Sequence, residues 1–299
     1  MGASARAAWP LEEAMETLER VGAEARAEME RYLWRHETDN IALLSELRRG
    51  QRLAANRLDP PTLLGYRLGG RMVAVQAIYR SGRWLPHMER DEILPEMLED
   101  ARPYWLRWLM GVRRVVDPIL ERLPALGYRV TYDEIDDFCV VDAATLVPRP
   151  APGVRRATRR DVEDVATLRC AFEGEYFSVP LERIERAWCL RAAERYIAEG
   201  AYIAERHGHA VAMVAVEATL PQLTHIGAVY TERGYRGQGL AKGVVTAICQ
   251  EHLRTKARVT LNVRVDNEAA IRAYRALGFR VAGDYRMCRL APESRSEHG

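Results

Sequence analysis

A glycine-rich loop between two apolar segments carries the clearest chemistry in this sequence. Arg236, Gly237 and Gly239 follow a β-branched stretch and precede an amphipathic pattern that begins near residue 240. Glycines at such a joint let successive backbone N–H groups point at one ligand, and a helix N-terminus favours an anion. Arg236 adds a fixed positive charge. The loop therefore predicts a binding site for a phosphate or pyrophosphate group.

A second informative segment follows the next alternating stretch of the chain. Residues 258–265 alternate polar and apolar side chains, which predicts a half-buried strand. Asn267 then suits the N-cap of a helix, Ala270 and Tyr274 lie four residues apart on one face of that helix, and Gly278 suits the left-handed position after its end. A β-α-β-α-β order would thus position both segments in one sheet.

These two segments resemble motifs of the GNAT superfamily of N-acetyltransferases. Residues 236–241 are similar to the Q/R-x-x-G-x-G/A signature, and residues 267–279 are similar to N-x-x-A-x-x-x-Y-x-x-x-G-F. Residues 225–231 resemble the branch that includes glycine N-acyltransferases. The resemblance covers residues 153–290 and implies transfer of an acyl group, most simply acetyl, from acetyl-CoA to a primary amine by direct attack.

The resemblance also implies roles for individual residues. The backbone near Val229 would pair with the pantetheine arm of acetyl-CoA, and Tyr274 would protonate the departing thiolate. The alternative for Tyr274 is a core aromatic of its amphipathic helix. The residues expected to bind acetyl-CoA are Val229, Tyr230, Thr231, Arg236, Gly237, Gln238, Gly239, Leu240, Ala241, Asn267 and Tyr274.

The group that deprotonates the amine is less clearly marked. Glu217 and His225 fall on adjacent predicted strands facing the expected acceptor site, and either can accept a proton directly or through water. Both also fit solvated positions at strand ends. Glu173, Glu175 and Tyr176 follow the first helix of this half and either line the acceptor site or form a surface loop.

The first half of the chain repeats the order of elements without the loop motif. A hairpin at residues 63–79, a strand at 105–110 and a helix at 113–123 echo the second half, which indicates a diverged duplicate. Gly111 stands at the corresponding joint, but no Arg-x-x-Gly-x-Gly pattern follows it, so CoA binding is not expected there. His87 is expected in a loop.

These patterns predict an α+β fold with an α/β-type mixed sheet, built as tandem GNAT-like domains, each a central sheet flanked by helices. The predicted boundaries are residues 1–146 for a degenerate first domain, 153–290 for the acetyltransferase domain and 291–299 for a flexible tail, with a proline-rich linker at 147–153. Further helices are expected at residues 11–34, 41–47, 92–101, 160 onwards, 181–199, 239–253 and 267–277, and further strands at 128–141, 154–157, 201–205, 210–217, 223–231 and 281–290.

Composition limits the other classes of function. The 44 basic and 42 acidic residues nearly balance, so no nucleic-acid partner is expected. No apolar run is long enough to cross a bilayer and no leader is recognisable, so a cytoplasmic protein without a membrane partner is expected. The five cysteines are scattered without a C-x-x-C pair, which predicts free thiols and no metal site.

The acceptor is expected to be a small-molecule or peptide amine, and a homodimer is left open. One alternative is a non-catalytic acetyl-CoA sensor or scaffold, favoured by the absence of an obvious base. Another is a nucleotide-phosphate enzyme, which the lack of G-x-x-x-x-G-K-[ST] and G-x-G-x-x-G disfavours.

Overall fold

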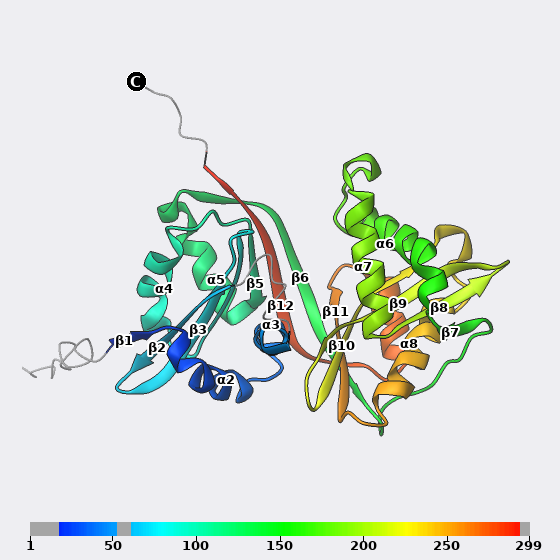
Figure 1. Cartoon of the computed structure of the whole chain (residues 1–299), viewed down its shortest axis with the longest axis horizontal. Helices are drawn as coiled ribbons and strands as arrows, with labels where there is room; N and C mark the ends of the chain where they lie inside the picture. The colour runs from blue at the N-terminus through cyan, green and yellow to red at the C-terminus, as the bar shows by residue number, and fades with distance from the viewer. Residues whose placement is uncertain (1–17, 53–60, 294–299) are drawn as a thin grey trace, which may run out of the picture. The chain divides into compact units, whose positions relative to one another are not determined.

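The computed structural model describes residues 18–52 and 61–293 and divides the chain into two compact units (Figure 1). Unit 1 takes the chain up to Glu134 and from Tyr285 onwards, and unit 2 is Ile135–Asp284. Strands β6 (Tyr128–Asp142) and β12 (Arg280–Pro292) each contribute residues to both units. The division therefore differs from the sequence-based boundaries at residues 146, 153 and 290, because the last strand of the chain joins the sheet of the first unit.

Unit 1 is a mixed sheet with flanking helices. Its strands β1 to β4 pair antiparallel in chain order, β4 pairs parallel with β5, and β12 pairs antiparallel with β5. A core that includes Trp84, Ile78 and Met97 lies beneath the helices. The elements are β1 (Leu18–Val21), α2 (Arg26–Trp34), α3 (Ile41–Arg52), β2 (Thr62–Leu68), β3 (Arg71–Ile78), β4 (Arg83–Met88), α4 (Leu94–Ala101), β5 (Trp108–Val112) and α5 (Arg113–Arg122).

Most of the elements predicted for the first half are present. The β2–β3 hairpin turns at Gly69 and Gly70, which have positive φ angles of 58° and 75° that favour glycine. The helix predicted at residues 11–34 is wrong over Leu18–Val21, which pairs with β2, and its first residues lie outside the described part of the chain. An edge strand with a partner overrides helix propensity there.

His87 was predicted in a loop, and that prediction is wrong. It lies in β4 with its side chain 1% exposed, paired with Val75 of β3. Pro86 argued against a strand in the sequence, because proline has no N–H to donate to a neighbouring strand and is found mainly at edges, strand starts and bulges. Residues 291 and 292, expected in a flexible tail, belong to β12, whereas 294–299 lie outside the described residues.

Unit 2 is also a mixed sheet. Its strands lie in the order β7-β8-β9-β10-β11-β6, with β7 at the edge. Pairing is antiparallel except between β10 and β11. One core cluster packs α6 and α7 on the sheet, and another packs α8 and α9. The elements are β7 (Val154–Arg156), α6 (Val162–Tyr176), α7 (Arg186–Glu199), β8 (Ala201–Arg206), β9 (His209–Thr219), β10 (Leu223–Thr231), α8 (Leu240–His252), β11 (Arg258–Arg264) and α9 (Glu268–Ala276).

Local chemistry explains two of these helix ends. Before α6, Thr158 and Asp161 form a capping box, which satisfies backbone N–H groups that the helix leaves without partners. After α9, Gly278 has a φ of 91°, and a Cβ there would lie 1.8 Å from the carbonyl oxygen of Thr145. The glycine predicted at this left-handed position is therefore required by both conformation and space.

The cysteines differ from the prediction of five free thiols. Cys170 of α6 and Cys189 of α7 form a disulfide with a Cα–Cα distance of 5.9 Å, whereas Cys139, Cys249 and Cys288 are free and buried. No sequence pattern indicates this pair, because the packing of α6 on α7 brings the two residues together. Among the described residues, no helix has the length and apolar character needed to span a bilayer.

Candidate acyl-CoA site

Strand β10 departs from regular pairing on both sides. Its parallel pairing with β11 ends at His225 and Thr260. Its register with β9 shifts between Gly227 and Tyr230, and Ala228 within that shift has a φ of 49°. A non-glycine residue at positive φ is uncommon and frequently marks a functional site. Beyond His225, the edge of β10 that faces β11 is therefore available to pair with an extended ligand.

Three of the expected binding residues lie on this part of β10. Val229 and Thr231 are half-buried, and Tyr230 is 8% exposed. The carbonyl oxygen of Thr231 accepts a hydrogen bond from Nε of Arg236 at 2.9 Å. The strand and the glycine loop are thus fastened to each other by a contact that the sequence did not predict.

The loop after β10 has the backbone conformation that the glycines predicted. Gly237 and Gly239 both have a φ of 77°, and Gly239 is the N-cap of α8 with no side chain capping the helix. No atom lies within 4 Å of the position that a Cβ on Gly237 would take. The first N–H groups of α8 therefore lack a side-chain cap beside open space, as an anion site at a helix N-terminus requires.

The residues around this helix start divide into anchors and exposed groups. Leu240, Val244 and Ile248 are buried against the sheet and hold the start of α8 in place. Gln238 is exposed and Ala241 is half-buried. Leu240 can thus offer its backbone N–H but not its side chain, and the binding roles of all three loop positions remain predictions.

Arg236 is held by a carboxylate from another element. Glu175 of α6 accepts hydrogen bonds from Nη2 of Arg236 at 2.7 Å, from Nε of Arg233 at 3.1 Å and from the Tyr230 hydroxyl at 2.6 Å. Burial alone would raise the pKa of Glu175, but these three donors outweigh it and lower that pKa to about 2. Glu175 therefore remains charged and ties α6 to the loop. The contact joins residues 61 positions apart, which no local pattern reveals.

The two candidate bases lie close together. Glu217 is the residue that the β9–β10 register skips, between the pairs His225–Ala218 and Ile226–Val216. A Cβ on Gly227 would lie 2.3 Å from the carboxyl carbon of Glu217, so this carboxyl group packs directly on the β10 backbone. Burial lowers the pKa of His225, and the negative charge of Glu217 raises it. Nδ1 of His225 is 3.0 Å from the Thr260 hydroxyl.

Glu173, one turn before the end of α6, adds a second carboxyl group near Glu217. Burial raises the pKa of Glu173, and the charge of Glu217 raises it further, against the opposing effect of Arg169. Arg169 forms an ion pair with Glu173 and stacks over the Trp188 ring with its guanidinium carbon 4.8 Å from the ring centroid. Of the three residues proposed for the acceptor side, Glu173 interacts electrostatically with Glu217, Glu175 binds the loop, and Tyr176 stacks on Phe172.

Tyr274 of α9 lies on the other face of the sheet. It is 8% exposed in the same core cluster as Ile226 and Leu240, and its ring centroid lies 5.8 Å from that of Phe279. Burial raises its pKa, so Tyr274 keeps its proton at neutral pH. This packing fits both a core aromatic and a proton donor. Asn267 caps α9 by accepting from the Ala270 N–H at 3.1 Å, as predicted, and its contact with acetyl-CoA remains a prediction.

Comparisons with known proteins agree with this architecture. Residues 162–279 match the model of the acetyltransferase (GNAT) family. This range includes the glycine loop and α9. A comparison with curated proteins found no match. The glycine N-acyltransferase branch, to which residues 225–231 were compared, receives no support from these findings and remains a prediction.

Solved structures match nearly the whole chain. A tandem GNAT protein from the clavulanic acid biosynthesis pathway is 15% identical, with 94% of this chain and 100% of that chain covered and a TM-score of 0.57. A Drosophila protein is 13% identical over 93% and 99% of the two chains with a TM-score of 0.65. A GCN5-related N-acetyltransferase from Sphaerobacter thermophilus is 16% identical over 92% and 96%, with a TM-score of 0.60. At these identities the likeness shows the fold alone, which is a tandem GNAT fold.

Proposed function

We propose that unit 2 is an acetyl-CoA-dependent N-acetyltransferase that acts on a primary amine. The observation that carries the proposal is the free edge of β10 beside the uncapped start of α8. The pyrophosphate would bind the N–H groups at Gly237 to Ala241, and the pantetheine arm would pair with β10 near Val229. The family match over residues 162–279 supports the same assignment.

The side chains on the two faces of the sheet support a different role for each face. An acceptor amine carries a positive charge in water and must lose a proton before it attacks the thioester. Glu217 suits this role because glycine at position 227 leaves its carboxyl group against the strand that would hold the thioester. His225, which burial keeps largely neutral, can relay the proton.

Tyr274 would complete the reaction from the opposite face. Attack by the amine on the thioester carbonyl breaks the C–S bond and leaves a thiolate, which needs a proton. Tyr274 holds its proton at neutral pH because burial raises its pKa. A ligand lying in the separation between β10 and β11 would meet Glu217 on one side and Tyr274 on the other.

The carboxyl groups favour a cationic acceptor. Glu173 and Glu217 interact electrostatically, and burial already raises the pKa of Glu173. Two carboxylates, set against the arginine that pairs with Glu173, favour an amine over an acceptor that carries its own carboxylate. We therefore expect polyamines, amino sugars or peptide amines without nearby acidic groups to be better acceptors than free amino acids.

Release of free thiol from acetyl-CoA tests this function. The purified chain should release CoA with saturable dependence on at least one amine in a panel of polyamines, amino sugars, amino acids and peptides. Glu217→Gln should lower kcat by about 10-fold to 1,000-fold, as loss of a general base does. Binding of acetyl-CoA without turnover on any acceptor would contradict the enzyme assignment and favour a sensor.

A further inference from the structure

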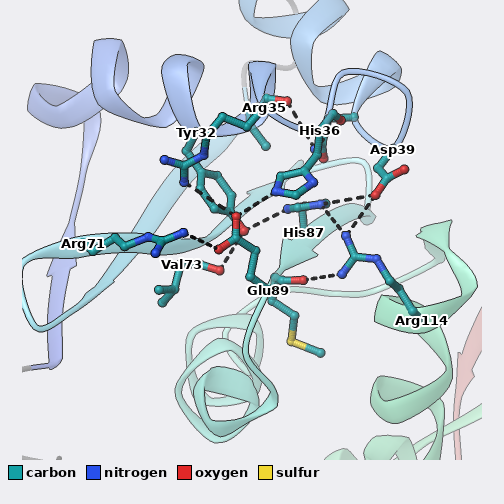
Figure 2. Close-up of polar contacts among 12 residues, drawn as sticks. Tyr32, Arg35, His36, Asp39, Arg71, Val73, His87, Glu89 and Arg114 are labelled. Carbon is teal, nitrogen blue, oxygen red and sulfur yellow. Dashed lines mark hydrogen bonds and ion pairs between the residues drawn. The ribbon is translucent and has the colours of Figure 1, made fainter.

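Unit 1 contains a cluster of imidazole and carboxylate groups that the proposed transfer reaction does not use (Figure 2). His36 follows α2, Asp39 precedes α3, and His87 lies in β4. One potential ligand atom from each residue lies within 4.8 Å of the others. Three segments of the fold therefore bring two imidazoles and a carboxylate to one point.

The hydrogen bonds around His87 leave a lone pair directed into this cluster. The Tyr32 hydroxyl donates its hydrogen to the carbonyl of Val73 at 2.7 Å, so its oxygen accepts from Nδ1 of His87 at 3.0 Å. Nε2 of His87 then carries the lone pair, and it lies 3.8 Å from a carboxylate oxygen of Asp39. A histidine that binds a metal usually donates its other ring N–H to a neighbouring acceptor, as Nδ1 of His87 does here to the Tyr32 hydroxyl.

His36 is held in a similar way. Its Nε2 lies 2.7 Å from a carboxylate oxygen of Glu89, and its ring centroid lies 5.2 Å from that of His87. Glu89 also faces Arg35 at 3.6 Å and Arg71 at 3.5 Å. A carboxylate that orients one nitrogen of a histidine leaves the other nitrogen for a ligand, which is a common second layer around metal sites.

Arg114 of α5 occupies the point where these groups converge. Its Nη2 lies 2.9 Å from both the Asp39 carboxylate and Nε2 of His87, and its Nη1 donates to the carbonyl of Met88 at 2.8 Å. The side chain of Arg114 is 47% exposed. A cation is thus already held between the Asp39 carboxylate and the His87 ring, on a side chain that is open to solvent.

His87 lies at a position in the sheet of unit 1 that has a counterpart in the sheet of unit 2. The parallel pairing of β4 with β5 ends at Trp84 and Leu109, so His87 lies where β4 has left β5. In unit 2 the corresponding stretch of β10, beyond His225, is the proposed acyl-CoA edge. Unit 1 therefore places His87, and with it this cluster, where unit 2 places the backbone that would bind substrate.

We propose that His36, Asp39 and His87 form a site for a divalent transition metal of the zinc class, with Arg114 in its place when the metal is absent. Two imidazoles and one carboxylate are a ligand set of Zn²⁺ and related ions, whereas Mg²⁺ and Ca²⁺ prefer oxygen ligands. Zinc bonds of about 2.0–2.2 Å require the ligand atoms to move together by about 1 Å and Arg114 to swing away. The proposal departs from the sequence-based expectation of no metal.

Titration of the untagged full-length chain with Zn²⁺ tests the proposal, by calorimetry and by the metal content of dialysed protein. We expect one saturable site, no comparable binding of Mg²⁺, and the visible absorption of a low-coordinate complex when Co²⁺ is used instead. His36→Gln and Asp39→Asn alter half-buried residues and should each weaken Zn²⁺ binding by at least about tenfold, because loss of even an outer partner of a metal ligand costs about 10-fold to 100-fold. His209→Gln, on β9 of unit 2, is the matched control and should bind as the wild type does.

The Arg114→Gln variant distinguishes a metal site from a cluster in which Arg114 is the permanent cation. Removal of the competing cation should tighten Zn²⁺ binding if the metal takes its place. Weaker binding in this variant would overturn the proposal, as would zinc binding that persists in the His36→Gln, Asp39→Asn double variant. Absence of saturable binding in the wild type and in Arg114→Gln would show that the arginine is the permanent cation of this cluster.

Discussion

At the scale of single residues, Gly227 and Glu217 show how the backbone sets the position of a reactive group. Glu217 is displaced from the regular register by a bulge, and its carboxyl group occupies the space that any Cβ at position 227 would need. Bulges often direct a side chain towards a functional site. The glycine on the neighbouring strand therefore provides the space that this carboxyl group occupies.

Replacement of that glycine should reduce turnover without touching the proposed acetyl-CoA loop. Gly227→Ala would push the Glu217 carboxyl group away, because the new Cβ would lie 2.3 Å from its carbon. We expect kcat to fall by about 10-fold to 100-fold, a usual range for a displaced general base, with acetyl-CoA affinity unchanged. Gly234→Ala, where no atom lies within 4 Å, is the control. Equal rates for both variants would exclude Glu217 as the base.

Tyr274 can be tested by removal of one oxygen atom. Tyr274→Phe keeps the ring against Phe279 but removes the proposed proton donor. Steady-state kinetics should show kcat lowered by about 10-fold to 100-fold, and KM for acetyl-CoA nearly constant. Tyr202→Phe removes a hydroxyl that bonds to Glu251 elsewhere in unit 2 and should leave kcat unchanged. A wild-type kcat in Tyr274→Phe would identify this tyrosine as a core aromatic alone.

Residue-scale predictions from the sequence succeeded where the physics is local. The conformations of Gly237 and Gly239 and the cap at Asn267 depend on a few adjacent residues and were predictable. The contact of Glu175 with Arg236 was not predictable, because it depends on how α6 packs beside the loop. The same is true of Glu217 and Gly227, whose contact requires the exact register of two strands.

At the scale of elements, α6 begins at a charged cap that makes stability depend on pH. Arg155 lowers the pKa of Asp161 to about 2, partial burial opposes this, and the backbone N–H and hydroxyl of Thr158 lower it further. The ordinary value is 3.8, so the stabilising contribution is complete above about pH 4 and is lost as the pH falls towards 2. Acid should therefore weaken the start of α6.

Asp161→Asn should remove this dependence. At pH 7 we expect a loss of about 1–2 kcal/mol in unfolding free energy, the usual cost of a lost cap. Because the variant has no carboxyl group at this position, its difference from the wild type should shrink between pH 4 and pH 2. Denaturant unfolding at several pH values measures both effects. Glu163→Gln, an exposed acid in the same first turn, is the control, and a pH-independent difference in Asp161→Asn would contradict the account.

The disulfide between α6 and α7 is another property of paired elements. After unfolding without reductant, alkylation should label Cys139, Cys249 and Cys288 but not Cys170 or Cys189. The Cys170→Ala, Cys189→Ala variant should unfold about 2–4 kcal/mol more easily than the oxidised wild type. Cys249→Ala leaves the disulfide intact and serves as the control for loss of a buried thiol. Labelling of all five cysteines would show that the bond does not form in solution.

Sequence patterns identified most elements because their periodicity is strong. Within residues 18–52 and 61–293, the two strands that were missed are β1 and β4. Both are short and depend on their partners: β1 pairs with the edge of β2, and β4 lies between β3 and β5. Pro86 in β4 and the helix-forming residues of β1 each favour another state locally. Tertiary pairing decided both cases, and pairing partners are not visible in a single segment.

At the scale of the whole molecule, the chain returns to its first unit at its end. Tyr285–Arg289 of β12 pairs with β5, and Arg286 forms ion pairs with Asp117 at 2.6 Å and Asp133 at 2.5 Å. The two units are therefore not separable by a single cut in the sequence. This explains why a boundary drawn from the resemblance alone, at residue 290, assigned the last strand to the second domain.

Truncation should reveal this dependence. A chain that ends at Asp284 loses the β12 partner of β5, so amide exchange in β5 and α5 should accelerate strongly while exchange in α8 changes little. A chain that ends at Glu293 retains β12 and should exchange as the full-length protein does. Unchanged protection of β5 in the shorter chain would contradict the assignment of this strand to unit 1.

The central claim is that the glycine loop of unit 2 binds the phosphates of acetyl-CoA, and direct measurement of that affinity tests it best. Gly237→Asp and Gly208→Asp are a matched pair: both glycines have positive φ, of 77° and 83°, and neither has an atom within 4 Å of the added Cβ. Each substitution therefore adds the same charge and similar strain, but Gly208 lies in the β8–β9 turn. We predict that calorimetry will show acetyl-CoA affinity reduced at least about tenfold in Gly237→Asp and unchanged in Gly208→Asp, since the new carboxylate would oppose the phosphates. Equal affinity in both variants, or no binding by the wild type, would contradict the account.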